Sequence, residues 1–204
     1  MEHYLNPWDE RYSVGEFVYG TEPNDFLRQH AHLLLASSRV LCLADGEGRN
    51  GVYLASLGHQ VTSVDSSAIG LEKAQRLAKQ RGVSIVTICA DLASFDLGNQ
   101  QWDAIVSIFC HLPQPLRSNL HRGIDRALAP GGMFLLEAYT PEQLQYKTGG
   151  PPTEELLMTC SQLRGELTPL VIESCHERTR AIHEGILHNG MSAVVQVVGR
   201  RSER

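Results

Sequence analysis

The sequence predicts an α/β fold with a doubly wound sheet of about seven strands, in which five parallel strands precede a C-terminal antiparallel hairpin. Three observations lead to this prediction. Short apolar runs alternate with segments whose apolar residues recur at helical spacing. The first two apolar runs are joined by a glycine-rich turn, and the last two segments have strand character. Such an alternation builds a parallel sheet with helices on both faces.

The glycine-rich turn is the most informative stretch of the chain. Residues 40–44 form an apolar run that is long enough for a buried strand and too short for a helix. Gly46, Gly48 and Gly51 follow in the spacing G-x-G-x-x-G, and a helix is expected over residues 52–57. Glycines let a ligand lie against the backbone, and the free N–H groups of the helix start suit an anionic group.

A carboxylate follows each of the next two predicted strands. Asp65 ends a strand over residues 61–64, where it can accept hydrogen bonds from a ribose diol. Asp91 and Leu92 end a strand that reads as a buried run over residues 83–90, where they can contact an adenine; Asp91 could instead cap the next turn. Together these residues predict a nucleoside cofactor, and the alternative is a tight turn in a fold without a ligand.

The remaining elements follow from periodicity and from capping residues. Helices are expected over residues 25–37, from Ser66 or Ser67 to 79–81, and over 113–128 and 154–167. Further strands are expected over residues 104–109, 133–138 (after a turn at 130–132), 171–182 and 192–199. Asn189-Gly190 carries the signal for the turn of the final hairpin.

Candidate catalytic residues lie at or near the carboxyl edge of the sheet. His111 and Tyr139 follow the fourth and fifth strands, and His111 could orient a substrate, take a proton or simply begin the next helix. On the strand after residue 171, His176, Arg178 and Glu184 share one face, which could hold an anionic substrate or face solvent. The candidates are therefore His111, Tyr139 and Arg178. The histidines lack ligand spacing, so no metal site is predicted.

The chain is expected to form one domain in three parts. Residues 1–38 contain an aromatic-rich arm, which either packs on the domain or acts as a lid, and a helix. Residues 39–140 form the cofactor-binding core. Residues 141–204 contain a loop at 146–152 that could gate a substrate, then a helix and the terminal hairpin.

Composition restricts the class of protein. Hydrophobic residues make up 42% and charged residues 20% of the chain, with a net charge of −5, so a nucleic-acid backbone is not the expected partner. The five cysteines lack C-x-x-C spacing and are expected to be reduced and mostly buried. No signal peptide or membrane-spanning run is recognised, which favours a cytoplasmic location. The oligomeric state is left open between a monomer and a small homo-oligomer.

With these residues in view, the sequence resembles the class I S-adenosylmethionine-dependent methyltransferases, and within them the small TehB-like tellurite-resistance and thiol-methylating enzymes. The matching segments are residues 8–12, 19–23, 44–51, 65, 91–92, 130–132, 137–141 and 185. The resemblance implies a Rossmann-like fold and S-adenosyl-L-methionine as cofactor. The expected cofactor-binding residues are Tyr19, Ala44, Asp45, Gly46, Glu47, Gly48, Asn50, Asp65, Ser66, Asp91, Leu92, Ser107 and Phe109.

One position departs from the pattern of these methyltransferases. They carry an acid two positions before the first glycine, whereas Ala44 stands there and Asp45 follows, so Asp45 either replaces that charge or the brace is missing. The resemblance implies in-line methyl transfer to a small molecule, with a thiol or a tellurite- or selenite-type oxyanion as acceptor. The alternatives are an NAD- or other nucleotide-binding protein and a sensor that binds the cofactor without catalysis.

Overall fold

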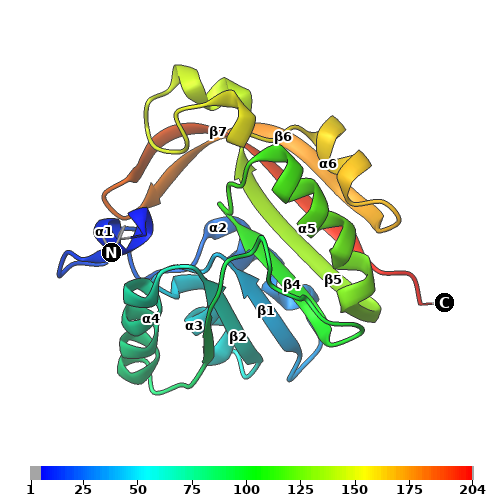
Figure 1. The fold of residues 1–204 in the computed structure, drawn as a ribbon, viewed down its shortest axis with the longest axis horizontal. Helices are drawn as coiled ribbons and strands as arrows, with labels where there is room; N and C mark the ends of the chain where they lie inside the picture. The colour runs from blue at the N-terminus through cyan, green and yellow to red at the C-terminus, as the bar shows by residue number, and fades with distance from the viewer. Residues whose placement is uncertain (1–5, 204) are drawn as a thin grey trace.

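The computed structural model describes residues 6–203, and these form a seven-stranded sheet with helices on both faces (Figure 1). The strands are β1 (Arg39–Leu43), β2 (Gln60–Asp65), β3 (Val86–Cys89), β4 (Trp102–Ile108), β5 (Leu128–Tyr139), β6 (Val171–Glu184) and β7 (His188–Arg200). Their order is β3-β2-β1-β4-β5-β7-β6. Strands β1 to β5 are parallel, and β7 is antiparallel to both of its neighbours. The predicted fold class is confirmed.

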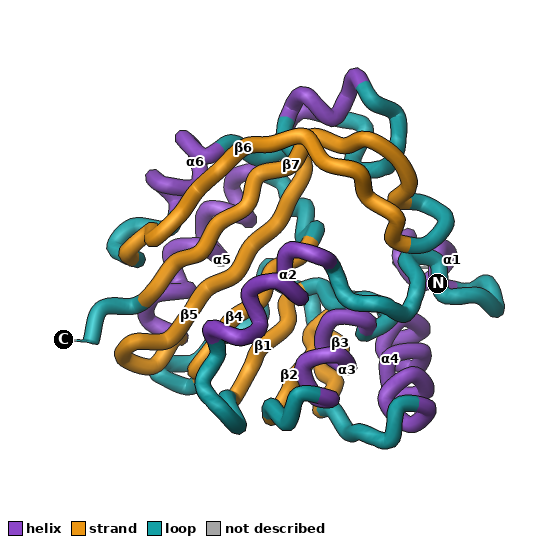
Figure 2. The backbone as a smooth tube through the Cα atoms, turned by 180° about the vertical axis from the view of Figure 1, so that it is seen from behind, coloured by secondary structure: helices purple, strands orange, loops and turns teal. Residues whose placement is uncertain are grey.

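Helices cover both faces of the sheet (Figures 1 and 2). The α-helices are α1 (Pro7–Tyr12), α2 (Asp25–His30), α3 (Arg49–Ser56), α4 (Ala68–Gln80), α5 (Gln114–Ala127) and α6 (Cys160–Glu166). Three short 3-10 helices are η1 (Ala31–Leu33), η2 (Pro141–Gln145) and η3 (Glu154–Leu156). Apolar residues of α2, α3 and α4 pack on one face of the sheet, and those of α5 and α6 pack on the other. None of the helices within residues 6–203 is long and apolar enough to cross a membrane.

The central strands explain the two-sided core. Successive side chains of a strand point to opposite faces. Leu41 and Leu43 of β1 pack toward α5 and α6, while Val40 and Cys42 pack toward α2, α3 and α4. All four are fully buried, so β1 reads as a continuous apolar run because both of its faces are covered.

Strand β3 differs from its prediction. The buried strand expected over residues 83–90 is only Val86–Cys89, and Val86 is 58% exposed. It lies at the edge of the sheet, where β2 is its one neighbour and the helices leave its outer part uncovered. An apolar run therefore indicated a strand here but wrongly indicated burial.

The helix expected over residues 154–167 is divided into η3 and α6. Between them, Leu157 and Met158 are extended and fully buried in the core, and the Met158 N–H donates to the Tyr139 carbonyl at 3.0 Å. This contact with β5 interrupts the helix. Thr159 then begins α6 with a capping box in which its side chain and that of Gln162 each bind the other's backbone.

The turn of the last hairpin lies at residues 185–187, because Glu184 pairs with His188 across β6 and β7. The predicted turn at Asn189-Gly190 was wrong. These two residues lie inside β7, opposite His183 and Ile182. The many paired residues of β6 and β7 determine where the turn lies, and the local Asn-Gly pair does not.

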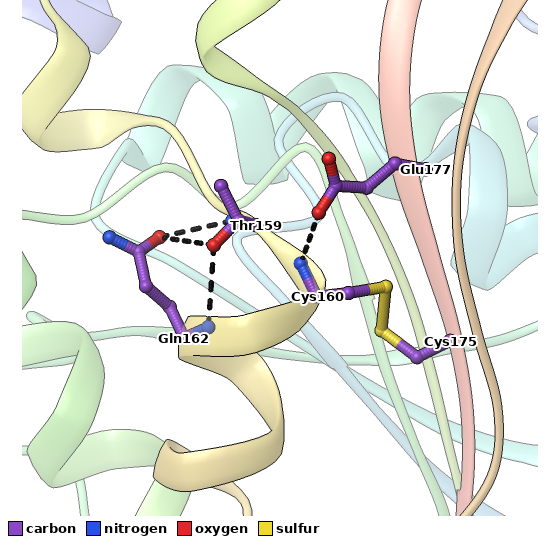
Figure 3. The surroundings of a disulfide bond; sticks show 5 residues. All are labelled: Thr159, Cys160, Gln162, Cys175 and Glu177. Carbon is purple, nitrogen blue, oxygen red and sulfur yellow. Dashed lines mark hydrogen bonds between the residues drawn. A yellow bond between two sulfur atoms is a disulfide. The ribbon is translucent and has the colours of Figure 1, made fainter.

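A disulfide joins Cys160 at the start of α6 to Cys175 on β6, with 5.8 Å between the Cα atoms (Figure 3). The Cys160 N–H also donates to the Glu177 carboxylate at 2.6 Å. The expectation of five reduced, mostly buried cysteines was therefore wrong for this pair, and Cys89 is exposed. Sequence spacing could not reveal the pairing, because it depends on how α6 packs against β6. A cytoplasmic location stays a prediction.

The hairpin turn contacts the N-terminal arm. The Ile186 N–H donates to the Val18 carbonyl at 2.9 Å, and a Cβ on Gly185 would come within 2.3 Å of the same oxygen. Figure 2 shows β6 and β7 curving toward α1 at this end of the molecule. The arm from residue 6 onward is thus held between α4 and the hairpin; residues 1–5 lie outside the described part of the chain.

Candidate active site

A cavity of about 510 Å³ opens at the carboxyl edge of the parallel strands. This volume is in the range of sites for small molecules. The residues that line it are Trp8, Arg11, Tyr12, Tyr19, Ala44, Asp45, Glu47, Arg49, Asn50, Asp65, Ser66, Asp91, Leu92, Ile108, Phe109, Cys110, His111, Leu112, Gly149, Gly150, Pro151, Pro152, Leu156, Leu187 and His188. They come from the arm, from the ends of β1 to β4, from the loop at 146–152 and from the hairpin.

The glycine turn forms one wall of the cavity, although its first two glycines face protein. A Cβ on Gly46 would lie 2.5 Å from the Tyr12 hydroxyl, and one on Gly48 would lie 2.4 Å from the Ala74 Cβ. Gly48 also has a φ of 83°, which favours glycine, and it begins α3. Because α1 and α4 pack closely on the turn, a side chain at either position would clash with them, which explains why both residues are glycines. Of the residues predicted to bind the cofactor, Gly46, Gly48 and Ser107 do not line the cavity.

Asp65 connects the glycine turn to the cavity. One carboxylate oxygen accepts from the Gly46 N–H and the other from the Ser67 N–H, each at 2.8 Å. Burial raises the pKa of Asp65, and these two backbone donors partly offset the effect. A carboxylate has about four acceptor positions. Asp65 lines the cavity, so two positions are left for hydroxyl donors of a ligand.

Asp91 lies at the exposed end of the same edge. Its Oδ1 accepts from the Ala93 N–H at 2.8 Å, which is the turn-capping role considered from the sequence. Asp91 and the buried Leu92 nevertheless line the cavity together. The cap leaves acceptor positions on the carboxylate, so the adenine contact stays a prediction that the geometry permits.

Asp45 braces the turn from inside. Its Oδ2 accepts from the Ser63 hydroxyl at 2.6 Å and from the Gly51 N–H at 3.2 Å. Burial raises the pKa of Asp45 to about 7, and the Ser63 hydrogen bond opposes that shift. These contacts tie the turn to β2 and to the start of α3. A carboxylate one position later than in the usual methyltransferase pattern therefore supplies the brace.

The cations along the cavity are used in different ways. Arg49 is buried and pairs with Glu184 at 2.6 Å. Glu47 is buried, pairs with Lys73 and accepts from the Tyr19 N–H at 3.3 Å. Arg11 is exposed, donates to the Tyr19 hydroxyl at 3.0 Å and has no carboxylate partner among residues 6–203. Arg11 is thus the lining cation that is available to an anionic ligand group.

The opposite wall is aromatic. Phe109 stacks on Tyr139 with 4.6 Å between ring centroids, and the His188 ring lies 4.8 Å from Phe109 and 4.5 Å from Tyr19. Tyr139 itself is fully buried behind Phe109 and does not line the cavity. The wall therefore joins the arm, β4 and β7.

Both nitrogens of His111 have backbone partners. Nδ1 lies 2.8 Å from the Leu156 carbonyl, and Nε2 accepts from the Tyr139 N–H at 3.4 Å. With Nδ1 as the donor, the ring is neutral, and burial lowers its pKa to about 4. This arrangement connects the end of β4 to η3 and β5 and leaves no free nitrogen to accept a substrate proton.

Arg178 is exposed on β6, away from the cavity. The anion-holding face proposed from strand alternation is not assembled at this site, because Glu184 is buried against Arg49 while His176 and Arg178 are in solvent. Sequence reasoning missed His188, and it included Arg11 only as part of a matching segment. The position of His188 depends on the register of the hairpin, and the Asn189-Gly190 pair wrongly indicates a different turn.

Comparisons with known proteins agree with this geometry. Residues 40–132 match the family described as the methyltransferase domain. The chain is 28% identical over 115 residues to 2-heptyl-1-hydroxyquinolin-4(1H)-one methyltransferase of Mycobacteroides abscessus, covering 55% of this chain and 51% of that protein. It is also 28% identical over 150 residues to the uncharacterized methyltransferase YodH of Bacillus subtilis, covering 70% and 61%. The chain thus spans about half to three fifths of these relatives.

Solved structures share the fold. A structure from work on the conversion of a disulfide bond into a thioacetal group during echinomycin biosynthesis matches with a TM-score of 0.73 and 21% identity, over 97% of this chain and 91% of the other. TehB from Haemophilus influenzae matches with a TM-score of 0.72 and 18% identity, over 96% and 66%. Residues 40–132 thus match a methyltransferase domain, which supports the predicted S-adenosylmethionine cofactor. The predicted resemblance to methyltransferases is thus supported over residues 40–132, and the fold is shared with TehB.

Proposed function

We propose that the chain transfers a methyl group from S-adenosylmethionine to a small-molecule acceptor by in-line displacement. The observation that carries the proposal is Asp65, which lines the cavity beside the glycine turn with acceptor positions still free. When bound, S-adenosylmethionine supplies a methyl group on a positively charged sulfur. The protein's task is then to align the acceptor and exclude water.

The residues of the cavity fit each part of this cofactor. Asp65 would hold the ribose hydroxyls, and Asp91 with Leu92 would contact the adenine. Arg11, whose guanidinium binds the Tyr19 hydroxyl but pairs with no carboxylate among residues 6–203, would hold the carboxylate of the methionine end. Tyr19 and Trp8 of the arm would cover this part of the cavity, so we propose that the arm acts as a lid.

We propose that His111 and Tyr139 hold the aromatic wall on the acceptor side of the cavity in place. His111 is not proposed as a base, because the structure offers it no free nitrogen for proton transfer. Arg178 is left out of the proposed machinery because it is in solvent. Between the two acceptor classes suggested by the resemblance, a thiol is favoured over an oxyanion, since Arg11 is the available cation and the cofactor's own carboxylate would use it. The Mycobacteroides relative acts on an organic hydroxyquinolinone, which also supports a carbon-based acceptor.

The test is calorimetry with S-adenosylmethionine and with NAD. We expect S-adenosylmethionine to bind and Asp65→Asn to weaken it by roughly 10- to 150-fold, because hydrogen bonds to a charged group contribute about 1.5–3 kcal/mol. Asp103→Asn is the matched control, since Asp103 pairs with Arg39 on the surface away from the cavity. Binding of NAD alone would replace the proposal with a nucleotide-binding function. Cofactor binding without turnover of thiol, hydroxyl or oxyanion acceptors would favour a sensor.

A further inference from the structure

We propose that the half of the cavity opposite the glycine turn is an acceptor subsite for a flat, uncharged aromatic ring that carries one hydroxyl or thiol group, and that His188 is a specificity-determining residue of this subsite. The inference rests on the proposed function, because it needs a methyl donor in the other half. It narrows the acceptor to a class of molecule that the resemblance to TehB-like enzymes does not name.

The first argument is the division of charge along the cavity. Every lining Asp, Glu and Arg side chain comes from the arm, from the glycine turn with the start of α3, or from the ends of β2 and β3. The opposite half is lined by Phe109–Leu112, Gly149–Pro152, Leu156, Leu187 and His188, none of which carries a formal charge at neutral pH when the two histidines are neutral. A charged acceptor would lose its hydration there, and the nearby guanidinium groups of Arg49 and Arg180 already pair with carboxylates.

The second argument is the shape of the wall. The rings of Tyr19, Phe109 and His188 meet with centroid distances of 4.5 and 4.8 Å, and the Phe109–His188 pair is edge to face. Rings in such a cluster leave a face and an edge for one more ring, which gains about 0.5–1.5 kcal/mol beyond its buried area. Gly149 and Gly150 bring the loop close to the hairpin and to Tyr139, which narrows the subsite.

The third argument is the unused polarity of His188. Its side chain lines the cavity, and its Nδ1 is buried without a hydrogen-bond partner. The Tyr139 hydroxyl, on a ring 5.4 Å away, is also buried without a partner. Buried polar groups of folded proteins nearly always have partners, so the unpaired nitrogen of His188, which lines the cavity, indicates a polar ligand group that completes it. Burial also lowers the pKa of His188 to about 3, so the ring is a neutral acceptor.

The transfer step follows from this placement. A lone pair of the acceptor's oxygen or sulfur forms the bond to the methyl carbon, and the carbon–sulfur bond of the donor breaks with its electron pair left on sulfur. The acceptor's proton passes to water. The role assigned to His188 is to receive the hydrogen bond of the hydroxyl or thiol and so fix which ring atom faces the methyl group.

The test compares four probes on the full chain by calorimetry, with and without S-adenosylmethionine. The probes are 2-naphthol, its saturated analogue decahydro-2-naphthol, the anion 2-naphthoate and tellurite. We expect 2-naphthol to bind at least about 2- to 12-fold more tightly than the saturated analogue, from the aromatic contribution alone. We also expect it to bind more tightly than either anion, and to remain bound when S-adenosylmethionine is present.

Two variants and a control locate the site. His188→Asn and Phe109→Leu should each weaken 2-naphthol by about 2- to 12-fold and reduce its preference over the saturated analogue. His183→Asn, an exposed histidine of the same hairpin, should change neither. Equal binding of the saturated analogue, stronger binding of an anion, loss of 2-naphthol when S-adenosylmethionine is added, or no 2-naphthol binding would overturn the inference. Failure of S-adenosylmethionine to bind would instead refute the proposed function. The probe series uses the unmodified chain, so its result does not depend on whether a variant folds.

Discussion

Glu137→Gln tests the buried charge cluster beneath the cavity. The Glu137 side chain is fully buried on β5 and accepts from Asn24 at 2.7 Å, from Arg180 at 3.1 and 2.5 Å, and from Gln196. Arg180 also contacts Glu184 at 3.3 Å. The cluster therefore joins the cap of α2 to three strands at the end of the sheet that carries the hairpin.

The magnitude follows from charge balance. Glu137 and Glu184 are the buried carboxylates that face Arg49 and Arg180, and the partly exposed Asp25 lies 3.5 Å from Arg180, so replacing Glu137 leaves two largely buried guanidinium groups with one buried carboxylate. The glutamine also presents an amide donor to side chains that donate. Removing one partner of a buried pair costs about 3–5 kcal/mol, a large share of the total stability of a domain. With a urea slope of about 1–3 kcal/mol/M, the unfolding midpoint should fall by about 1 M or more.

Urea unfolding of the variant and of a matched control decides the matter. Glu173→Gln breaks the pair with Arg200, whose side chains are 40% and 37% exposed, and should cost about 0–1 kcal/mol. Equal costs for Glu137→Gln and Glu173→Gln would refute the reasoning. Arg180→Met provides a further check, because its combination with Glu137→Gln should cost less than the sum of the two single changes.

Three further predictions concern stability. Replacing Cys160 and Cys175 by serine should lower the free energy of unfolding by about 3 kcal/mol, as expected for a loop closed over 15 positions, and urea midpoints with and without reductant check this. Asp45→Asn should become more stable relative to the unmodified chain as pH rises from about 4 to 7, by about 1.4 kcal/mol per pH unit, in urea unfolding across that range. Gly48→Ala should destabilise by at least about 1–2 kcal/mol, measured by thermal unfolding, because of its φ of 83° and its contact with α4.

The sign of the Asp45 effect follows from its raised pKa. The folded state holds the Asp45 proton more tightly than the unfolded state. The contribution of Asp45 to the free energy of unfolding is therefore complete below about pH 4 and is lost as pH rises through about 7. A constant difference between variant and unmodified chain would contradict it. The control for the disulfide variant is Cys89→Ser, which should leave the free energy of unfolding unchanged because Cys89 is exposed and unpaired in the described structure. The control for Gly48→Ala is Gly165→Ala, which has open space around its Cα and should raise the free energy of unfolding by about 0.5–1 kcal/mol.

The parts of the fold that the sequence predicted are those determined by local pattern. The apolar run of β1, the glycine turn and the Ser67 cap of α4 each need only neighbouring residues to be recognised, and the structure has all three. The exposure of β3 was missed because its place at the edge of the sheet depends on strand order. The hairpin turn was missed because thirteen paired positions, from Val171–Arg200 to Glu184–His188, outweigh one dipeptide.

The candidate site divides in the same way. Asp65, Asp91 and Asp45 could be identified because each directly follows a strand predicted from the sequence, and the structure places all three along the cavity. His188 could not be identified, since it reaches the cavity only through the register of β6 and β7. Arg178 was chosen by strand alternation, which gives the face of a residue but not whether another element covers that face.

The contact between the hairpin turn and the arm has a consequence for biosynthesis. Asn24 and Arg49 bind Glu184, and Val18 binds Ile186, so the arm and the start of α3 are completed by a hairpin that follows much later in the sequence. A nascent chain paused on the ribosome before residue 184 would contain the glycine turn and its acids but lack Leu187 and His188 of the opposite half of the cavity. Chains fold as they emerge from their N-terminal end. The complete cavity therefore forms only after the hairpin has been synthesised, and a product truncated before it would lack these contacts.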